Sequence, residues 1–374
     1  MSDAPAQTTP EALPVSLLTG FLGSGKTTLL NRLLKHPGMA KTAVVINEFG
    51  EIGIDNDLVE KSGEDVVLMS SGCLCCTVRG DLVDTLRSLY IRRAKNELPP
   101  FERVVVETTG LADPAPILHT LMADPFLVTR YRLDGVITTV DAVNGAGTLD
   151  RHAEAVKQAA VADRLVLTKP DLADQERQAA LLARLARLNP GAPVRPVIAG
   201  EVDPAVLFDA GLYDPKRKTV DVQRWLNEEA YAGAHAHDHH GHDHGHDHAH
   251  GPGAGAGQDP HDVNRHDAHI RAFCMTYDRP FAWSTVAIWL ELLATYRGED
   301  LLRVKGILNV DEAPGPIVIH GVQHLFHPPV ALPDWPSADR RSRLVFITRD
   351  MDRATIESML TALDRPVEAG GSAA

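Results

Sequence analysis

Three cysteines, Cys73, Cys75 and Cys76, lie within four positions in the stretch SSGCLCCTVRGDL (70–82). Neighbouring cysteines seldom form a disulfide with each other, because the geometry is strained. Three thiolates on a tight turn can instead converge on one borderline ion such as zinc, leaving a fourth position for Glu48, water or a client side chain. Such an exchangeable position suits a metal carrier. A buried cluster of small side chains, or a redox switch, is the alternative.

A second motif, GFLGSGKT, occupies residues 20–27 and matches G-x-x-x-x-G-K-[ST]. It follows an apolar run and opens an amphipathic stretch, which is the strand–loop–helix context of a phosphate-binding loop. We expect Lys26 to reach the β- and γ-phosphates and the Thr27 hydroxyl to ligate Mg²⁺. The pattern predicts binding of a nucleoside triphosphate, and the expected nucleotide-binding residues of this loop are Gly20, Gly23, Ser24, Gly25, Lys26, Thr27 and Thr28.

The base is predicted from TKPD, residues 168–171, which ends the apolar run RLVL. It is similar to the guanine-reading [NST]-K-x-D element: Asp171 would accept hydrogen bonds from guanine, and the stem of Lys169 would lie along the base. Thr168 stands where asparagine is more usual. An acidic helix cap is the alternative explanation for Asp171.

Two further segments close apolar runs. ETTG, residues 107–110, places Glu107 where a carboxylate can hold Mg²⁺ together with Thr27, and Gly110 where the backbone can approach the γ-phosphate. NEFG, residues 47–50, is the expected first switch segment. We expect Lys26, Thr27 and Glu107 to be the catalytic residues.

From residue 13 to about 222, short apolar runs alternate with helical patterns. This alternation predicts an α/β fold, a P-loop NTPase with a mostly parallel sheet and helices on both faces. The motifs all fall at carboxyl ends of expected strands. Residues 269–366 add apolar runs (HIRAFCMTY, LLRVKGILNV, GPIVIHGVQHLFH, SRLVFITR) and two helical stretches, which predict a smaller C-terminal α+β domain with an antiparallel sheet.

The expected divisions are a disordered N-terminus (1–12), the nucleotide-binding domain with the CxCC motif (13–222), a His-rich flexible linker (223–268), the C-terminal domain (269–366) and a disordered tail (367–374). Nine of the 18 histidines lie between 235 and 250, alternating with Asp, Ala and Gly. Such a segment can buffer divalent metals without fixed geometry. A solvated linker of drifted composition is the alternative.

Composition bounds the cellular setting and the partners. The net charge of −13 disfavours nucleic acid as a general partner. Because the polar start has no signal-peptide pattern and no apolar run is long enough to span a membrane, we expect a cytoplasmic protein without a membrane partner. Four cysteines in 374 residues are too few for a disulfide scaffold.

GFLGSGKTT, NEFG, GCLCC, ETTG and TKPD, in this order and followed by a separate C-terminal domain, resemble the CobW-type metallochaperone GTPases, which are SIMIBI-class P-loop proteins. RVKG (303–306) and GVQHLFHPP (321–329) add to the resemblance. It implies slow GTP hydrolysis and zinc or cobalt held by Cys73, Cys75 and Cys76, with Glu48 as a less certain fourth ligand.

The resulting expectation is a GTPase that uses GTP and Mg²⁺, binds zinc (or Co²⁺) and loads it into a client metalloprotein. A homodimer is one assembly open to it. The alternatives are cobalt delivery for cobalamin synthesis, activation of one dedicated metalloenzyme, and a non-enzymatic zinc store acting through the histidine run. An ATP-using kinase of similar fold is a weaker alternative, which TKPD disfavours.

Overall fold

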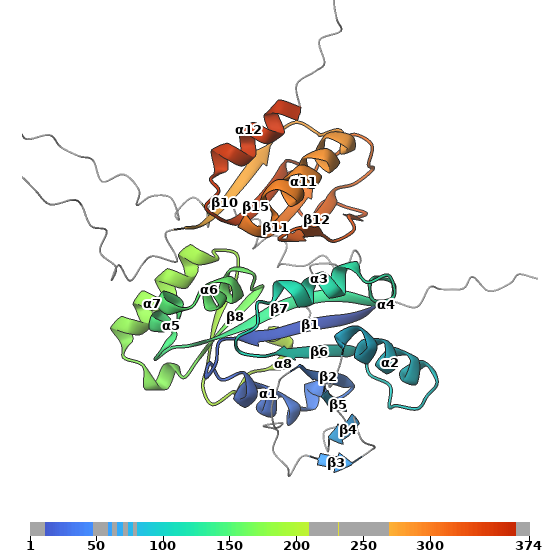
Figure 1. Cartoon of the computed structure of the whole chain (residues 1–374), viewed down its shortest axis with the longest axis vertical. Helices are drawn as coiled ribbons and strands as arrows, with labels where there is room; N and C mark the ends of the chain where they lie inside the picture. The colour runs from blue at the N-terminus through green and yellow to red at the C-terminus, as the bar shows by residue number, and fades with distance from the viewer. Residues whose placement is uncertain are drawn as a thin grey trace, which may run out of the picture.

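The computed structural model describes residues 12–47, 59–61, 66–69, 74–77, 81–208, 231 and 269–363. The expected N-terminal and C-terminal tails and nearly all of the expected linker, with its histidine run, lie outside these residues. Two bodies are visible in Figure 1, and each contains one sheet.

The first body contains the alternating strands and helices expected for an α/β domain. Its strands are β1 (Leu13–Gly20), β2 (Thr42–Asn47), β3 (Val59–Lys61), β4 (Val66–Met69), β5 (Leu74–Thr77), β6 (Arg103–Thr108), β7 (Tyr131–Asp141), β8 (Arg164–Thr168) and β9 (Val194–Val197). Its helices are α1 (Lys26–Leu34), η1 (Pro37–Met39), α2 (Leu82–Ala94), α3 (Ala115–Ala123), α4 (Leu127–Arg130), α5 (Gly145–Arg151), α6 (Ala153–Ala160), η3 (Pro170–Leu172), α7 (Gln175–Leu188) and α8 (Pro204–Leu207).

The nine strands form one sheet in the order β3-β4-β5-β2-β6-β1-β7-β8-β9. From β5 to β9 the neighbours are parallel, whereas β3 and β4 extend one edge in antiparallel fashion. The predicted mostly parallel sheet is therefore confirmed. Because β1 lies between β6 and β7, the loop after β1 is flanked by the loops that follow both neighbours.

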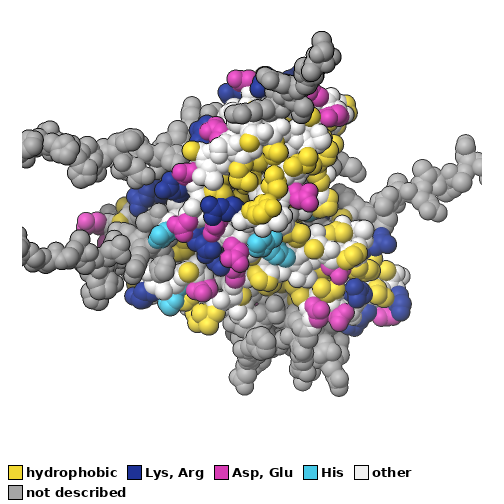
Figure 2. Space-filling view, turned by 45° about the horizontal axis from the view of Figure 1, so that its top comes forward, with side chains coloured by type: hydrophobic (Ala, Val, Ile, Leu, Met, Phe, Trp, Pro, Cys, Tyr) yellow, Lys and Arg dark blue, Asp and Glu magenta, His cyan; other side chains and the backbone are white. Residues whose placement is uncertain are grey.

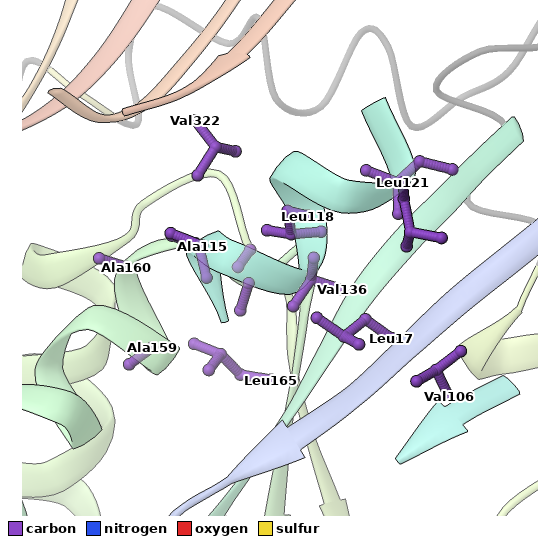
Figure 3. Packing of buried hydrophobic residues seen from close by; sticks show 14 of the residues in the cluster. Leu17, Val106, Ala115, Leu118, Leu121, Val136, Ala159, Ala160, Leu165 and Val322 are labelled. Carbon is purple, nitrogen blue, oxygen red and sulfur yellow. The ribbon is translucent and has the colours of Figure 1, made fainter. Parts of the chain in front are cut away.

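Helices cover both faces of this sheet, because its central strands are apolar on both sides. One face packs against α1 and α8 through a core that includes Leu29, Leu33, Val105 and Phe208. The other packs against α2, α3, α6 and α7 in a larger core, part of which Figure 3 shows around Leu17, Leu118, Val136 and Leu165.

The second body is the predicted antiparallel α+β domain. Its elements are β10 (Ile270–Tyr277), α11 (Trp283–Arg297), η5 (Gly298–Asp300), β11 (Leu301–Leu308), β12 (Ile317–Val322), β13 (Leu325–Phe326), β14 (Val330–Ala331), β15 (Ser342–Arg349) and α12 (Arg353–Leu363). The sheet order is β10-β15-β11-β12-β13, and β14 pairs with β12. Helices α11 and α12 pack on one face through a core around Trp289 and Phe346.

One detail of the sequence prediction was wrong here. The run GPIVIHGVQHLFH, expected as one strand, forms the hairpin of β12 and β13, with Val322 paired to Leu325. Gln323 adopts a left-handed conformation (φ 53°), which reverses the chain in a tight turn.

The other face of the C-terminal sheet lies against the first body, beside α3 and α6 (Figure 1). Charged side chains of both signs and histidines are interspersed on the face drawn in Figure 2, so no patch of a single sign dominates it. Within the described ranges, no helix has both the length and the apolar character needed to cross a bilayer.

Candidate nucleotide-binding site

The loop after β1 has the backbone shape of an anion-binding loop. Gly23 and Gly25 adopt left-handed conformations (φ 73° and 88°), which glycine takes without steric cost. Gly25 precedes α1, and no side chain caps that end of the helix, so its first N–H groups point into the loop. A side chain at Gly20 would collide with Thr139. Backbone donors at a helix N-terminus are suited to binding phosphate, so the shape of this loop is consistent with the predicted phosphate site.

Hydrogen bonds within the loop and to β7 fix the side chains of the phosphate loop. Lys26 is buried, and its Nζ donates to the carbonyl oxygens of Gly20 (2.8 Å) and Phe21 (3.3 Å), which places the ammonium at the centre of the loop. The hydroxyls of Ser24 and Thr139 are 2.6 Å apart, so β7 fixes the loop. Thr28 follows on α1 and is exposed.

Thr27 and Glu107 meet at the edge of the sheet. The Thr27 hydroxyl donates to Glu107 Oε1 at 3.5 Å, and Glu107 is almost fully buried at the end of β6. A hydroxyl and a carboxylate are hard oxygen ligands of the kind that Mg²⁺ prefers. The two residues expected to share Mg²⁺ therefore lie within reach of one ion.

Gly110 lies directly against the phosphate loop, at Leu22. A Cβ at position 110 would be 2.8 Å from the backbone nitrogen of Leu22 and 2.9 Å from its Cα, closer than real side chains approach. Only glycine allows the ETTG segment to touch the phosphate loop in this way.

The base motif joins the same site. The Thr168 hydroxyl donates to the carbonyl oxygen of Ser24 (2.7 Å) and lies 3.3 Å from that of Val140, so threonine ties β8 to the phosphate loop. Lys169 adopts a left-handed conformation (φ 55°), and its Nζ donates to the carbonyl oxygen of Gly23 at 2.9 Å. Asp171 is exposed in η3, where a base could reach it.

Asp141, which ends β7, lies beside these residues and belongs to none of the predicted motifs. Its Oδ2 accepts from Lys169 Nζ at 2.7 Å, and its Oδ1 accepts from the backbone of Val143. Burial raises the pKa of Asp141, but the hydrogen bonds from Lys169, Asn144 and Val143 outweigh this effect and hold the pKa below its usual value. An acidic residue closing the run VITTVD was the available signal.

A second missed segment follows β9. Ala199 and Gly200 both have left-handed backbones (φ 50° and 79°), and a Cβ on Gly200 would lie 2.8 Å from the carbonyl oxygen of Thr28. This loop therefore packs on the start of α1, and β9 lies next to the strand that ends in the base motif.

The predicted metal residues are only partly within the described chain. Cys73 and Glu48 lie outside it, and Cys75 and Cys76 are described by their backbone alone. These two were expected on a tight turn but lie in β5, because residues 74–77 pair in parallel with β2 and in antiparallel fashion with β4. Among the side chains that the structure describes, no three His, Cys, Asp or Glu gather as a metal site.

The loops after β1, β6, β7 and β8 thus bring a phosphate-binding loop, a buried carboxylate and a lysine–aspartate pair to one edge of the sheet. Residues 14–196 match the family described as CobW/HypB/UreG, nucleotide-binding domain, and residues 270–363 match the Cobalamin synthesis protein cobW C-terminal domain.

Similar proteins extend over the whole length. The zinc chaperone YjiA of Escherichia coli is 32% identical over 351 residues, which cover 94% of this chain and 98% of that protein. The zinc chaperone CobW of Pseudomonas aeruginosa is 30% identical, with coverage of 94% and 92%. The crystal structure of the Zn(II)-bound YjiA GTPase from E. coli matches with a TM-score of 0.69 and 30% identity, covering 95% of this chain and 100% of that one.

Proposed function

Because the chain belongs to the CobW/HypB/UreG family of nucleotide-binding proteins, we propose that it is a GTPase that binds zinc through its CxCC motif and passes the ion to a client metalloprotein. Its full-length relatives carry the name zinc chaperone, and one is a GTPase whose Zn(II)-bound structure is known. In this proposal zinc is the cargo, and GTP is the substrate that controls its retention.

The observation that carries the proposal is the strand register between the cysteine motif and the nucleotide site. Val45 of β2 is aligned with Cys76 on one side and with Val106 on the other. Neighbouring strands are about 4.8 Å apart, so the Cys76 backbone lies roughly 10 Å from β6, the strand that carries Glu107. The cysteine strand and the nucleotide site are thus parts of one hydrogen-bonded sheet.

The described side chains suit phosphoryl transfer to water. The loop amides and Lys26 would bind and neutralise the phosphates, while Lys169 and Asp171 would hold the guanine base. Mg²⁺, held by Thr27 and Glu107, would neutralise the charge that develops between the β- and γ-phosphates. Catalysis here depends on positioning and charge, and no residue of this edge is needed as a covalent nucleophile.

A switch between metal retention and release is built from the same register. Asn47, the last residue of β2, is aligned with Thr108 of the ETTG segment, and Glu48 comes next in the chain. Ordering of the ETTG segment by a γ-phosphate would therefore act on the residue before the proposed fourth zinc ligand. We propose that GTP assembles the zinc site and that hydrolysis, aided by the client, releases the ion.

The test is a zinc titration of the full-length protein against a chromophoric chelator, with no nucleotide, with GDP and with a non-hydrolysable GTP analogue. We expect one tight site whose affinity changes at least about tenfold between GDP and the analogue, which is about 1.4 kcal/mol. Replacing Cys73, Cys75 and Cys76 by serine should abolish the tight site. Cys274→Ser, a buried cysteine of the C-terminal domain, is the matched control and should leave it intact.

The alternatives predict other results. A tighter nucleotide-dependent site for Co²⁺ than for Zn²⁺ would indicate cobalt delivery. A zinc store based on the histidine run predicts a different set of results. Zinc binding would survive the three cysteine substitutions and would be unchanged by Lys26→Ala, but deletion of residues 234–250 would abolish it. Equal zinc affinity in all nucleotide states would refute the proposed switch.

A further inference from the structure

The C-terminal domain lies on two helices of the first body, α3 and α6. On α3, His119 Nε2 donates to the carbonyl oxygen of Val322 at 2.8 Å, and Figure 3 shows Val322 facing the start of that helix near Ala115. Side chains of both bodies share one apolar core, which includes Ala115, Leu118, Ala159, Ala160, Leu302, Ile307, Val322 and Val345.

Beyond the end of α6, a buried carboxylate anchors the C-terminal sheet. Asp163 Oδ1 accepts from Arg303 Nη2 at 2.6 Å and from Lys305 Nζ, both on β11, while Oδ2 accepts from the backbone of Val136 at 2.9 Å. All three charged residues are less than a tenth exposed. Two buried cations thus share one carboxylate of the other body.

The same two helices hold the loop between β6 and α3, residues 109–114, called the ETTG loop below. Helix α3 begins where the loop ends, and Asp113 Oδ1 accepts from the backbone of Ala115 at 2.9 Å. From α6, Gln158 Nε2 donates to the carbonyl oxygens of Gly110 (3.3 Å) and Ala112 (2.9 Å). Lys157 Nζ donates to Asp113 Oδ2 at 2.7 Å. Helix α6 thus holds the loop at three points.

Gln158 is placed in a way that stability alone does not explain. It is fully buried, and among the residues that the structure describes its Oε1 has no hydrogen-bond partner. It lines a cavity of about 230 Å³ whose wall also includes Leu22 and Ser24 of the phosphate loop. A buried unsatisfied acceptor costs about 1–3 kcal/mol. An apolar side chain would avoid that cost, but it would lose both contacts to the ETTG loop.

These contacts form a continuous route. The phosphate loop touches Gly110, Gly110 is held by Gln158 of α6, and α6 leads to Asp163, which binds β11. We propose that nucleotide binding and docking of the C-terminal domain are coupled through α6, with Gln158 as the positioning residue on the nucleotide side and Asp163 as the anchor on the other. The proposal rests on the proposed function only in requiring that the site binds guanine nucleotides.

Coupling of this kind is reciprocal. If a γ-phosphate moves the ETTG loop, the C-terminal sheet must be held differently, and weakening of that contact must in turn change the relative affinity for GTP and GDP. A purely structural interface would change stability without changing that ratio. The two cases can therefore be separated by experiment.

The first experiment needs no substitution. Hydrogen exchange of the full-length protein is compared without nucleotide, with GDP and with a non-hydrolysable GTP analogue. We expect the protection of backbone amides in residues 301–308 and 321–322 to differ between GDP and the analogue, although these residues lie outside the nucleotide site. Changes confined to residues 20–28, 107–112 and 168–171 would overturn the proposal. Lack of protection at 20–28 with any guanine nucleotide would refute the proposed function itself, and the coupling with it.

The second experiment uses Gln158→Leu, which keeps the volume but removes both donated hydrogen bonds. With GDP and the analogue each at saturating concentration, we expect the nucleotide-dependent change at residues 301–308 to disappear. Thr120→Ala is the control, because the Thr120 hydroxyl donates to the carbonyl oxygen of Pro116 at the start of the same helix, α3, and does not touch the loop. The nucleotide response at 301–308 should persist in that variant. Its persistence in Gln158→Leu as well would contradict the role of Gln158.

The reciprocal arm uses Asp163→Asn, which removes the charge that holds Arg303 and Lys305. We expect faster exchange at residues 301–308 and a change of about fivefold or more in the ratio of GTP-analogue to GDP affinity. An unchanged ratio in a protein whose C-terminal sheet has demonstrably loosened would mean that the interface is structural only.

Discussion

At the scale of single residues, Lys169 shows how the proposed base site is held before any nucleotide arrives. Its left-handed backbone directs the side chain back over the phosphate loop, where Gly23 and Asp141 accept from the ammonium. A side chain fixed in this way loses little further entropy when a base lies along its stem. We therefore expect Asp141 to act on nucleotide affinity through Lys169.

We predict that Asp141→Ala weakens GDP binding about tenfold, because a charge-assisted hydrogen bond of roughly 1.5–3 kcal/mol that orients Lys169 is lost. Titration with a fluorescent GDP analogue measures the effect. Asp174→Ala is the control: Asp174 caps α7 in the same region by accepting from the backbone of Arg177 and does not contact Lys169. Equal losses in the two variants would argue against a specific role for Asp141.

Short motifs predicted which residues lie at the candidate nucleotide site, but not which other side chains contact those residues. The phosphate loop, the Thr27–Glu107 pair and the Thr168–Lys169 motif could be read from short patterns, since each follows an apolar strand. Asp141 and Gln158 could not be assigned roles in this way. Their contacts depend on which strands and helices are neighbours, and Gln158 lies 46 and 48 positions from the carbonyls that it binds.

At the scale of elements, α6 is a short helix that depends on outside support. It has eight residues, and its last carbonyl oxygens accept hydrogen bonds from the side chain of Asn189, which directly follows α7. Asn189 Nδ2 donates to Ala159 (3.0 Å), Ala160 (3.0 Å) and Ala162 (2.8 Å). This amide therefore completes the end of the helix that lies next to Asp163.

We expect Asn189→Ala to destabilise the protein by about 2 kcal/mol, because buried carbonyls lose their donor. Urea unfolding followed by circular dichroism gives the value. Thr120→Ala removes an exposed hydrogen bond within α3 and should cost less than about 0.5 kcal/mol. A similar small effect in both variants would show that water replaces the amide.

Periodicity identified the parallel strands and the antiparallel C-terminal domain, because long apolar runs carry a clear signal. The cysteine segment was assigned to a turn because four residues, LCCT, are too few to show a period. Pairing with β2 and β4, which sequence does not display, makes it a strand. The division between β12 and β13 could not be predicted either, because β13 has only two residues and shows no period of its own.

At the scale of the whole molecule, the contact between the two bodies contains titratable groups that are separated widely in sequence. His320 is buried on β12, beside Lys305 of β11, and Asp163 comes from the first body. Burial lowers the pKa of His320 to about 4; the negative charge of Asp163 acts in the opposite direction, and His327 adds to the lowering. The histidine is therefore neutral in the folded protein near neutral pH.

This pKa predicts acid sensitivity. Below pH 6.5 the unfolded chain protonates this histidine, whereas the folded protein does not until about pH 4, so stability is complete above 6.5 and falls between 6.5 and 4. The loss is at most about 3 kcal/mol. Burial raises the pKa of Asp163, but the positive charges of Arg303 and Lys305 outweigh it and hold the pKa below its usual range. That carboxylate therefore stays charged throughout this window and adds nothing to the slope.

Thermal unfolding measured from pH 7.5 to 4.5 tests this expectation. His320→Gln should flatten the fall in Tm with decreasing pH, even if it lowers Tm at pH 7.5. The exposed His324 provides the control, since His324→Gln should leave the slope as it is. A parallel decline in all three proteins would assign the acid sensitivity to other groups.

The shared apolar core also has a consequence for biosynthesis. The last strand of the first body's sheet ends at Val197, whereas the sheet that covers α3 and α6 ends at Arg349 and its last helix at Leu363. At 5–20 residues per second, a ribosome needs roughly 10–30 s to make the remainder. During that interval the face around Leu118 and Ala160 is open to water and to other nascent chains. Newly made protein is therefore expected to expose, for that interval, an apolar surface of the kind that general folding chaperones bind.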